Sequence, residues 1–215
     1  MNTIEYLKEI YGYENPIILK NIRIGGKSKT AIRQELCRGY KKGVINRFSP
    51  GVYYIKKNAV SSLTGQNTSQ LGFDDYIENK YIKNNLTIYP ELFIYGYYSG
   101  QTFLNIIGIS QQVPGKKEIT TNNTSSKKRT IYIKGRYAII RKPKIEINYR
   151  NYKYLQFLDM FHFLSDDDFN ENIHLISAYI KANNFTKNEL NKYLNLYPMR
   201  TLKFIFESRL INDFN

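Results

Sequence analysis

The order of segments between Ile17 and Asn58 constrains the fold of this chain more than any other feature of its sequence. An apolar stretch is followed by the double glycine Gly25-Gly26 and then by the basic segment Lys27–Lys42. A two-stranded hairpin is expected over 44–55, because the turn-forming residues Ser49-Pro50-Gly51 interrupt two apolar runs. A helix, a tight turn, a basic helix and a two-stranded ribbon follow one another in this order in winged helix-turn-helix domains.

The basic segment has two different sides when it is placed on a helical wheel at roughly 100° per residue. Ile32 and Leu36 fall close together, with Glu35 and Gly39 beside them, and we expect this side to pack on a small core. The other side spans an arc about 140° wide and carries groups that hydrogen-bond to base edges. This arc holds Thr30, Arg33, Gln34, Cys37, Arg38 and Lys41.

We therefore expect this helix to contact double-stranded DNA, the alternative being an ordinary solvated face. Arg33, Gln34, Thr30 and Arg38 are assigned to base edges, and Ser28 is assigned to the helix N-cap. Arg47 in the hairpin is expected at a phosphate, with a minor-groove contact as the alternative. The predicted DNA-binding residues are Lys27, Ser28, Lys29, Thr30, Arg33, Gln34, Arg38, Lys41 and Arg47.

The positive charge of the chain is unevenly distributed. The formal net charge is +14. Residues 1–58 hold 12 Lys/Arg against 4 Asp/Glu, and residues 59–215 hold 20 against 14. About a quarter of the chain thus carries more than half of the excess, and such a field favours polyanions through counterion release. An anionic membrane would also be attracted, but no basic amphipathic anchor is evident, so we expect no membrane partner.

The sequence also indicates a compartment. Cys37 is the single cysteine, so no disulfide within the chain is possible, which fits a reducing environment. A redox switch at Cys37 is the less favoured alternative to an ordinary thiol. Because the N-terminus lacks an apolar signal segment and no run reaches transmembrane length, we expect a cytoplasmic protein.

Composition and periodicity divide the chain into three parts. Residues 1–58 are predicted to form the winged helix-turn-helix domain, with helices at 3–13 and from Pro16 onward. Residues 59–72 are small and polar and are interpreted as a linker. Residues 73–215 are predicted to form a second domain. The expected fold class is α+β, with a small antiparallel sheet and C-terminal helices in the second domain.

Within the second domain, helices are predicted at 73–83, after Ser99, and repeatedly from residue 149 onward. Thr186 and Glu189 form an expected capping box, and Pro198 is expected to open the last helix. Alternation predicts a three-stranded antiparallel sheet, with strands at 118–121, 130–134 and 137–141.

A second basic stretch runs from Lys116 to Arg150, with 11 Lys/Arg and only Glu118 and Glu146 as acids. It could extend a phosphate footprint, meet an acidic partner or be a solvated strand face. The loop 122–129 is expected to be exposed and mobile. The candidate residues of this second surface are Lys127, Lys128, Arg129, Arg136 and Arg141.

No set of residues predicts catalysis, a metal ion or a cofactor. His162 and His174 lack ligand companions, and a phosphate-binding glycine loop is missing. The acidic run Asp166–Asp168 could bind Mg²⁺, but its place after Ser165 favours stabilisation of a helix N-terminus. We expect no enzyme, and a nuclease that uses this run is the least favoured hypothesis.

Several sequence segments resemble parts of AbiEi-type antitoxins. Tyr97–Asn105, Gly108–Pro114 and Thr121–Arg129 are similar to the C-terminal part of these proteins. Ser28–Gln34 and Arg47–Ile55 are similar to their winged domain, and the resemblance extends to about residue 160. The segment after about residue 165 resembles nothing we can name.

The resemblance implies an antitoxin that also represses its own promoter. Its partners would be promoter DNA and a nucleotidyltransferase toxin encoded beside it, countered without a stable complex or by direct contact. The chain would act as a monomer, or as a dimer on inverted repeats. The alternative is a stand-alone winged-helix regulator whose second domain senses a ligand or dimerises.

Overall fold

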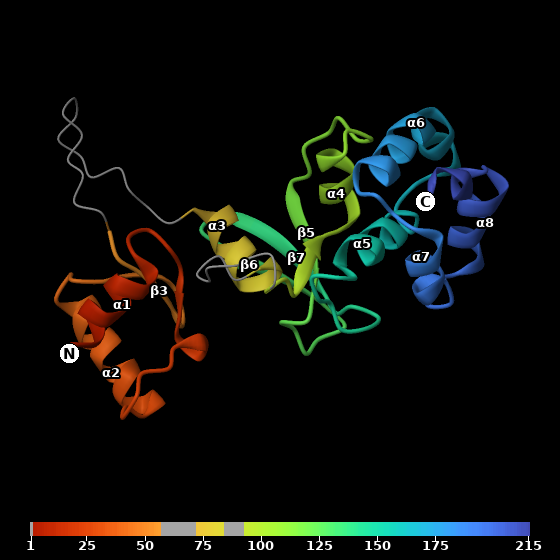
Figure 1. Cartoon of the computed structure of the whole chain (residues 1–215). Helices are drawn as coiled ribbons and strands as arrows, with labels where there is room; N and C mark the ends of the chain where they lie inside the picture. Colours follow the sequence, from red (N-terminus) through yellow and green to blue (C-terminus); the bar gives the residue numbers. More distant parts are fainter. Residues whose placement is uncertain (1, 57–71, 84–92) are drawn as a thin grey trace. The chain divides into compact units, whose positions relative to one another are not determined.

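The computed structural model describes residues 2–56, 72–83 and 93–215 and divides into two compact units (Figure 1). Unit 1 comprises residues 1–80 and 84–88, and unit 2 comprises residues 81–83 and 89–215. The predicted linker lies outside the described residues, apart from Gly72. Residues 73–80, which were expected to open the second domain, group with unit 1.

Residues 2–56 of unit 1 combine two α-helices with a small antiparallel sheet. Helix α1 (Thr3–Tyr11) begins after Asn2, and helix α2 (Lys29–Lys41) begins after Ser28. Strands β1 (Ile17–Ile18), β2 (Asn46–Ser49) and β3 (Val52–Tyr54) form the sheet in the order β1-β3-β2. The predicted hairpin at 44–55 is therefore confirmed.

The helix predicted to start at Pro16 is wrong. Ile17 and Ile18 pair with Tyr53 and Val52 of β3 as strand β1, and only the 3-10 turn η1 (Leu19–Asn21) follows. Both isoleucines are buried, and their β-branched side chains suit a strand that is covered by the core. Residues 17 and 18 therefore belong to the sheet, although Pro16 had been interpreted as the start of a helix.

Helix α2 is anchored to the core of unit 1 by the side that the wheel predicts. Ile32 and Leu36 are buried in one cluster with Leu7, Ile17 and Ile45. Each fully buried aliphatic side chain of this kind contributes about 1.5–3 kcal/mol through removal from water. The orientation of α2 about its axis is therefore fixed by these apolar contacts.

The predicted helix at 73–83 is present in two parts. It forms helix α3 (Phe73–Ile77) and continues as the π-helical turn η2 (Glu78–Ile82). The Tyr76 ring of α3 packs on Phe48 of β2, with ring centroids 5.0 Å apart. This aromatic contact is one reason why α3 belongs to unit 1.

Unit 2 contains a four-stranded mixed sheet. The strands are β4 (Gly96–Tyr98), β5 (Lys116–Thr121), β6 (Lys128–Ile133) and β7 (Arg136–Arg141), in the order β4-β5-β7-β6. The β4–β5 and β6–β7 pairs are antiparallel, whereas β5 and β7 are parallel. The α+β class is as predicted, but the three-stranded, purely antiparallel sheet is wrong.

Burial explains this strand order. Ala138 and Ile140 of β7 are fully buried, so β7 occupies a central position beside β5. Strand β6 begins with the exposed Lys128 and Arg129 and takes the edge, where charged side chains discourage pairing with another chain. The sequence analysis did not predict strand β4, whereas the helix expected after Ser99 is confirmed and begins at Gly100.

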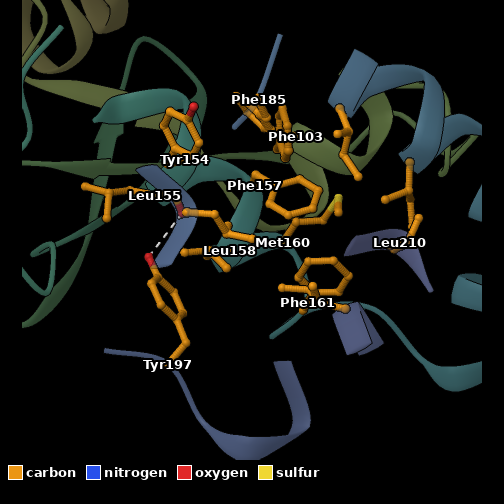
Figure 2. Close-up of a cluster of buried hydrophobic side chains, with 14 of the residues drawn as sticks. Phe103, Tyr154, Leu155, Phe157, Leu158, Met160, Phe161, Phe185, Tyr197 and Leu210 are labelled. Carbon is orange, nitrogen blue, oxygen red and sulfur yellow. Dashed lines mark hydrogen bonds between the residues drawn. The ribbon is translucent and has the colours of Figure 1, made fainter. Parts of the chain in front are cut away.

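The other regular elements of unit 2 are helices, and those that follow residue 165 group together in Figure 1. Figure 2 shows the aromatic core, in which the Phe157 and Phe161 rings meet edge to face with centroids 5.1 Å apart. The Tyr197 hydroxyl donates to the Leu155 carbonyl at 3.1 Å. The helices are α4 (Gly100–Ile106), α5 (Tyr152–Met160), α6 (Asp166–Ala182), α7 (Lys187–Leu194) and α8 (Met199–Glu207), followed by the 3-10 turn η4 (Leu210–Asp213).

The predicted helix starts are largely confirmed. Pro198 precedes α8, and Thr186 caps α7 by accepting a hydrogen bond from the Glu189 backbone N–H. A complete capping box would also have the Glu189 carboxylate accept from the Thr186 backbone N–H, but this carboxylate accepts from Lys192.

Candidate nucleic-acid interface

One side of helix α2 forms an exposed polar surface, which we call the α2 polar face. The side chains opposite it, Ile32 and Leu36, point into the core, so the predicted division of the helix is confirmed. The α2 polar face consists of Thr30, Arg33, Gln34, Cys37, Arg38 and Lys41, all of which are exposed.

Local sequence determines where α2 begins and ends. Gly26 adopts a φ of +74°, which glycine tolerates, and the Lys27 N–H donates to the Ile24 carbonyl at 3.1 Å. Ser28 Oγ then accepts from the Ala31 N–H at 3.1 Å and caps the helix, as predicted. Gly43, with a φ of +72°, follows the last helical turn. These turns fix the length of helix that carries the α2 polar face.

The cations of the α2 polar face make no hydrogen bond or ion pair with the described residues, although the positive charge of Arg38 helps to lower the pKa of Glu35. No hydrogen bond or ion pair within 2–56, 72–83 and 93–215 engages the side chains of Arg33, Arg38 or Lys41. The same holds in those ranges for Lys29 and for Arg47 of β2, which are also exposed. Their donors therefore remain available for an external acceptor.

Lys27 differs from the other cations that are predicted to bind DNA. Its ammonium donates to both carboxylate oxygens of Glu35, at 2.8 and 3.0 Å, and to Thr3 Oγ1 at 2.8 Å. The hydrogen bond from Lys27 lowers the pKa of Glu35. Glu35 is the one acid of α2, so this pair neutralises it on the inner flank and leaves the α2 polar face without a carboxylate.

A hollow lies beside the first turn of α2, within unit 1. The turn between β2 and β3 contributes Pro50 to its wall. The sequence interpretation missed Lys20 and Lys80, because nothing in their local pattern relates them to α2. The polar and cationic lining includes Lys20, Lys29, Thr30, Arg33 and Lys80. Clustered ammonium and guanidinium groups of this kind suit a phosphate or another anion.

Hydrogen bonds to other side chains engage part of the predicted second basic surface. Arg141, one of its candidate residues, pairs with Glu118 at 2.6 Å, so a carboxylate of the same sheet already compensates its charge. Arg129 donates to the Tyr81 hydroxyl at 3.2 Å. Lys127, Lys128 and Arg136 are exposed.

The loop at 122–129 is also more structured than expected. Asn122 exchanges two hydrogen bonds with the Ile147 backbone, at 2.8 and 2.9 Å. Residues 122–124 are half-buried, and Lys128 and Arg129 already belong to β6. Exposure is confirmed only for the remainder of the loop.

The described residues contain no group of three or more His, Cys, Asp and Glu side chains that could hold a metal ion. His162 and His174 are exposed. Ser165 caps α6 by accepting from the Asp168 N–H at 3.0 Å, and Asp166–Asp168 form the first turn, as the helix interpretation predicts.

A buried polar cluster beneath the sheet of unit 2 was missed. The Tyr97 hydroxyl donates to Asp159 Oδ2 at 3.3 Å, and Thr120 Oγ1 donates to the same atom at 3.4 Å. Burial raises the pKa of Asp159 and holds the pKa of Tyr97 well above its ordinary value. The cluster joins residues of β4, β5 and α5, and these three elements are distant from one another in sequence.

No protein-family model matches the chain, and no curated protein matches it either. Within the described ranges, no helix combines the length and the apolar character that crossing a bilayer requires.

Proposed function

We propose that the chain is a DNA-binding transcriptional regulator and that unit 1 is a winged helix-turn-helix domain. The observation that carries this proposal is the α2 polar face. It presents guanidinium, amide and hydroxyl groups together, and it has no carboxylate to repel DNA. Arg forms bidentate hydrogen bonds with guanine, Gln does so with adenine, and Thr contacts a base or a thymine methyl.

The order of elements supports this proposal. In such domains a recognition helix enters the major groove, which admits an α-helix, and a two-stranded wing follows. Helix α2 would be the recognition helix and β2–β3 the wing. Arg33 and Gln34 would contact base edges, while Lys29 and Arg47 would hold phosphates. In this assignment the single 3-10 turn η1 would take the place of the first helix of the helix-turn-helix motif, which is usually longer.

We further propose that the chain is an antitoxin of the AbiEi type, which represses its own promoter. This part rests on the sequence resemblance, which implies that the second domain counteracts a nucleotidyltransferase toxin. Unit 2 would supply that activity, with or without a stable complex. The proposal includes no enzymatic activity and no cofactor.

Equilibrium binding to duplex DNA tests the regulator. A labelled duplex from the region upstream of the gene should bind more tightly than an unrelated duplex of equal length. Affinity should also fall steeply with salt, because phosphate contacts release counterions. Equal affinity for both duplexes would contradict operator recognition.

Co-expression tests the antitoxin. A nucleotidyltransferase encoded beside the gene should arrest growth alone, and the full chain should restore growth. Restoration by an Arg33→Ala variant would separate antitoxin activity from repression. Operator binding without any rescue would instead favour the stand-alone regulator.

A further inference from the structure

The sheet of unit 2 presents a set of exposed side chains that we call the tyrosine–lysine face. Tyr132 of β6 is the register partner of Tyr137 of β7, and Tyr137 is the partner of Lys116 of β5. Thr130 and Lys128 lie two and four positions before Tyr132, so their side chains share its side of the sheet. All five residues are exposed.

The two tyrosines of this face are unusually accessible for sheet aromatics. Tyr132 is 62% exposed and Tyr137 is 43% exposed, whereas Tyr97, on the same sheet, is buried. Their ring centroids lie 4.6 Å apart at an interplanar angle of 40°. Two adjacent rings thus stand in solvent, although burial of each would be favourable.

The charge around these rings is positive. Lys116 Nζ lies 5.7 Å from the centre of the Tyr137 ring, and Lys128 lies further along β6. Glu118 is the one carboxylate in β5, β6 and β7. It accepts hydrogen bonds from Arg141 at 2.6 Å and from the Gln101 N–H at 3.3 Å, so its charge is compensated.

We propose that the tyrosine–lysine face binds single-stranded nucleic acid. Unpaired bases would stack on Tyr132 and Tyr137, and Lys116 and Lys128 would contact the adjacent phosphates. Exposed aromatic rings beside cations on a sheet surface are the combination that single strands require, because every base offers a flat face. A duplex hides those faces in its own stack. This site lies in unit 2 and does not depend on the α2 polar face.

Fluorescence anisotropy with the full chain tests the site. The probes are labelled oligo(dT) and oligo(U) of about 12 nucleotides, a length within the usual range for such surfaces, and a labelled duplex. Comparison of the two single strands shows whether the ligand is DNA or RNA. The double variant Tyr132→Ala/Tyr137→Ala should weaken binding of the preferred strand at least about 10-fold, since each stacked base contributes appreciably.

Tyr149→Ala is the matched control, because Tyr149 is an equally exposed tyrosine (43%) of unit 2 outside this face. It should bind single strands like the wild type. Tyr132→Phe keeps the ring and should also retain affinity. Lys116→Gln and Lys128→Gln should each reduce the salt dependence by somewhat less than one unit.

Arg33→Ala separates this site from the proposed operator contact. It should weaken duplex binding and leave single-strand binding intact, whereas the double tyrosine variant should do the reverse. Single-strand affinity that is unchanged in the double variant, or absent in the wild type, would overturn the proposal. Tyrosine-dependent binding of labelled poly(Glu) without binding of oligonucleotides would also overturn it, in favour of an acidic protein partner.

Discussion

The α2 polar face and the tyrosine–lysine face are both cationic and exposed, yet they are built differently. The α2 polar face contains guanidinium, amide and hydroxyl groups on a convex helix, and its six residues include no aromatic ring, although Tyr40 of the same helix is 46% exposed. The tyrosine–lysine face contains two rings on a sheet, and its guanidinium neighbour Arg141 is held by Glu118. Net charge alone would not distinguish them.

If both proposals hold, the geometry of the groups, rather than their charge, selects the form of nucleic acid. A helix can place donors against base edges in a groove, whereas a sheet can offer rings to unpaired bases. Two surfaces on one chain could therefore bind different nucleic acids independently.

The largest expected effect comes from Leu36→Ala. Leu36 is fully buried under the α2 polar face, so its truncation should destabilise unit 1 by about 2–5 kcal/mol. Duplex binding should fall with the loss of folded unit 1, while single-strand binding by unit 2 should persist. Hydrogen exchange of each unit, with both binding assays, measures this; equal loss of both activities would show that the surfaces are coupled.

Arg33→Ala should have the next largest effect. Loss of one bidentate contact should cost about 1–3 kcal/mol on the operator and relax base preference at one position. The matched control is Arg150→Ala, which removes an exposed arginine of unit 2. Binding to a panel of operators with single base changes measures this, and an unchanged preference would contradict the assignment of Arg33 to a base.

Lys29 and Lys27 should differ, although they are two residues apart. Lys29→Ala should lower the salt dependence of duplex binding by about one unit, because a phosphate contact is lost. Lys27→Ala should change it less, since Glu35 already engages that ammonium. Affinities measured between about 50 and 200 mM salt give both slopes; the reverse order would mean that Lys27 leaves Glu35 on binding.

The smallest effect is a difference in pH dependence between the units. The pKa of Glu35 is lowered in the folded chain. Its contribution to the stability of unit 1 is therefore present above pH 4.5 and is lost as the pH falls. The pKa of Asp159 is raised in the folded chain. Its contribution to the stability of unit 2 is therefore greatest below pH 3.8 and is lost as the pH rises through the folded-state pKa.

Acidification should therefore affect the two units in opposite directions through these groups. Asp159→Asn should abolish the part of the pH dependence of stability that Asp159 causes in unit 2. Glu35→Gln should abolish the part that Glu35 causes in unit 1. Hydrogen exchange across the acidic range measures both, with the wild type as reference. A pH trend in unit 2 that survives Asp159→Asn unchanged would remove Asp159 as its cause.

Local features of the fold could be predicted from the sequence. The division of α2 into a buried and an exposed side follows from periodicity around Ile32 and Leu36. Ser28, Ser165 and Thr186 cap helices because their hydroxyls accept from nearby N–H groups. The β2–β3 and β6–β7 hairpins follow from turn residues between apolar runs. In each case the interacting residues lie within a few positions of one another.

Long-range features could not be predicted. The parallel pairing of β5 with β7 depends on which strand is buried more deeply, and alternation does not reveal that. Strand β1 arises because Ile17 pairs with Tyr53. The Lys27–Glu35 pair and the Asp159 cluster require groups from different elements to meet in space. Tyr132 and Tyr137 became a site candidate only once their exposure was known.

The native thiol of Cys37 offers the most direct test of the α2 polar face. Cys37 is the single cysteine of the chain and lies exposed on that face, so a DNA-cleaving iron chelate can be attached there alone. The conjugate should cut the upstream duplex at one cluster of positions, whereas a chelate at Val113→Cys in a Cys37→Ser background should not cut there. Bound operator that the Cys37 conjugate leaves uncut would contradict the placement of α2 against DNA.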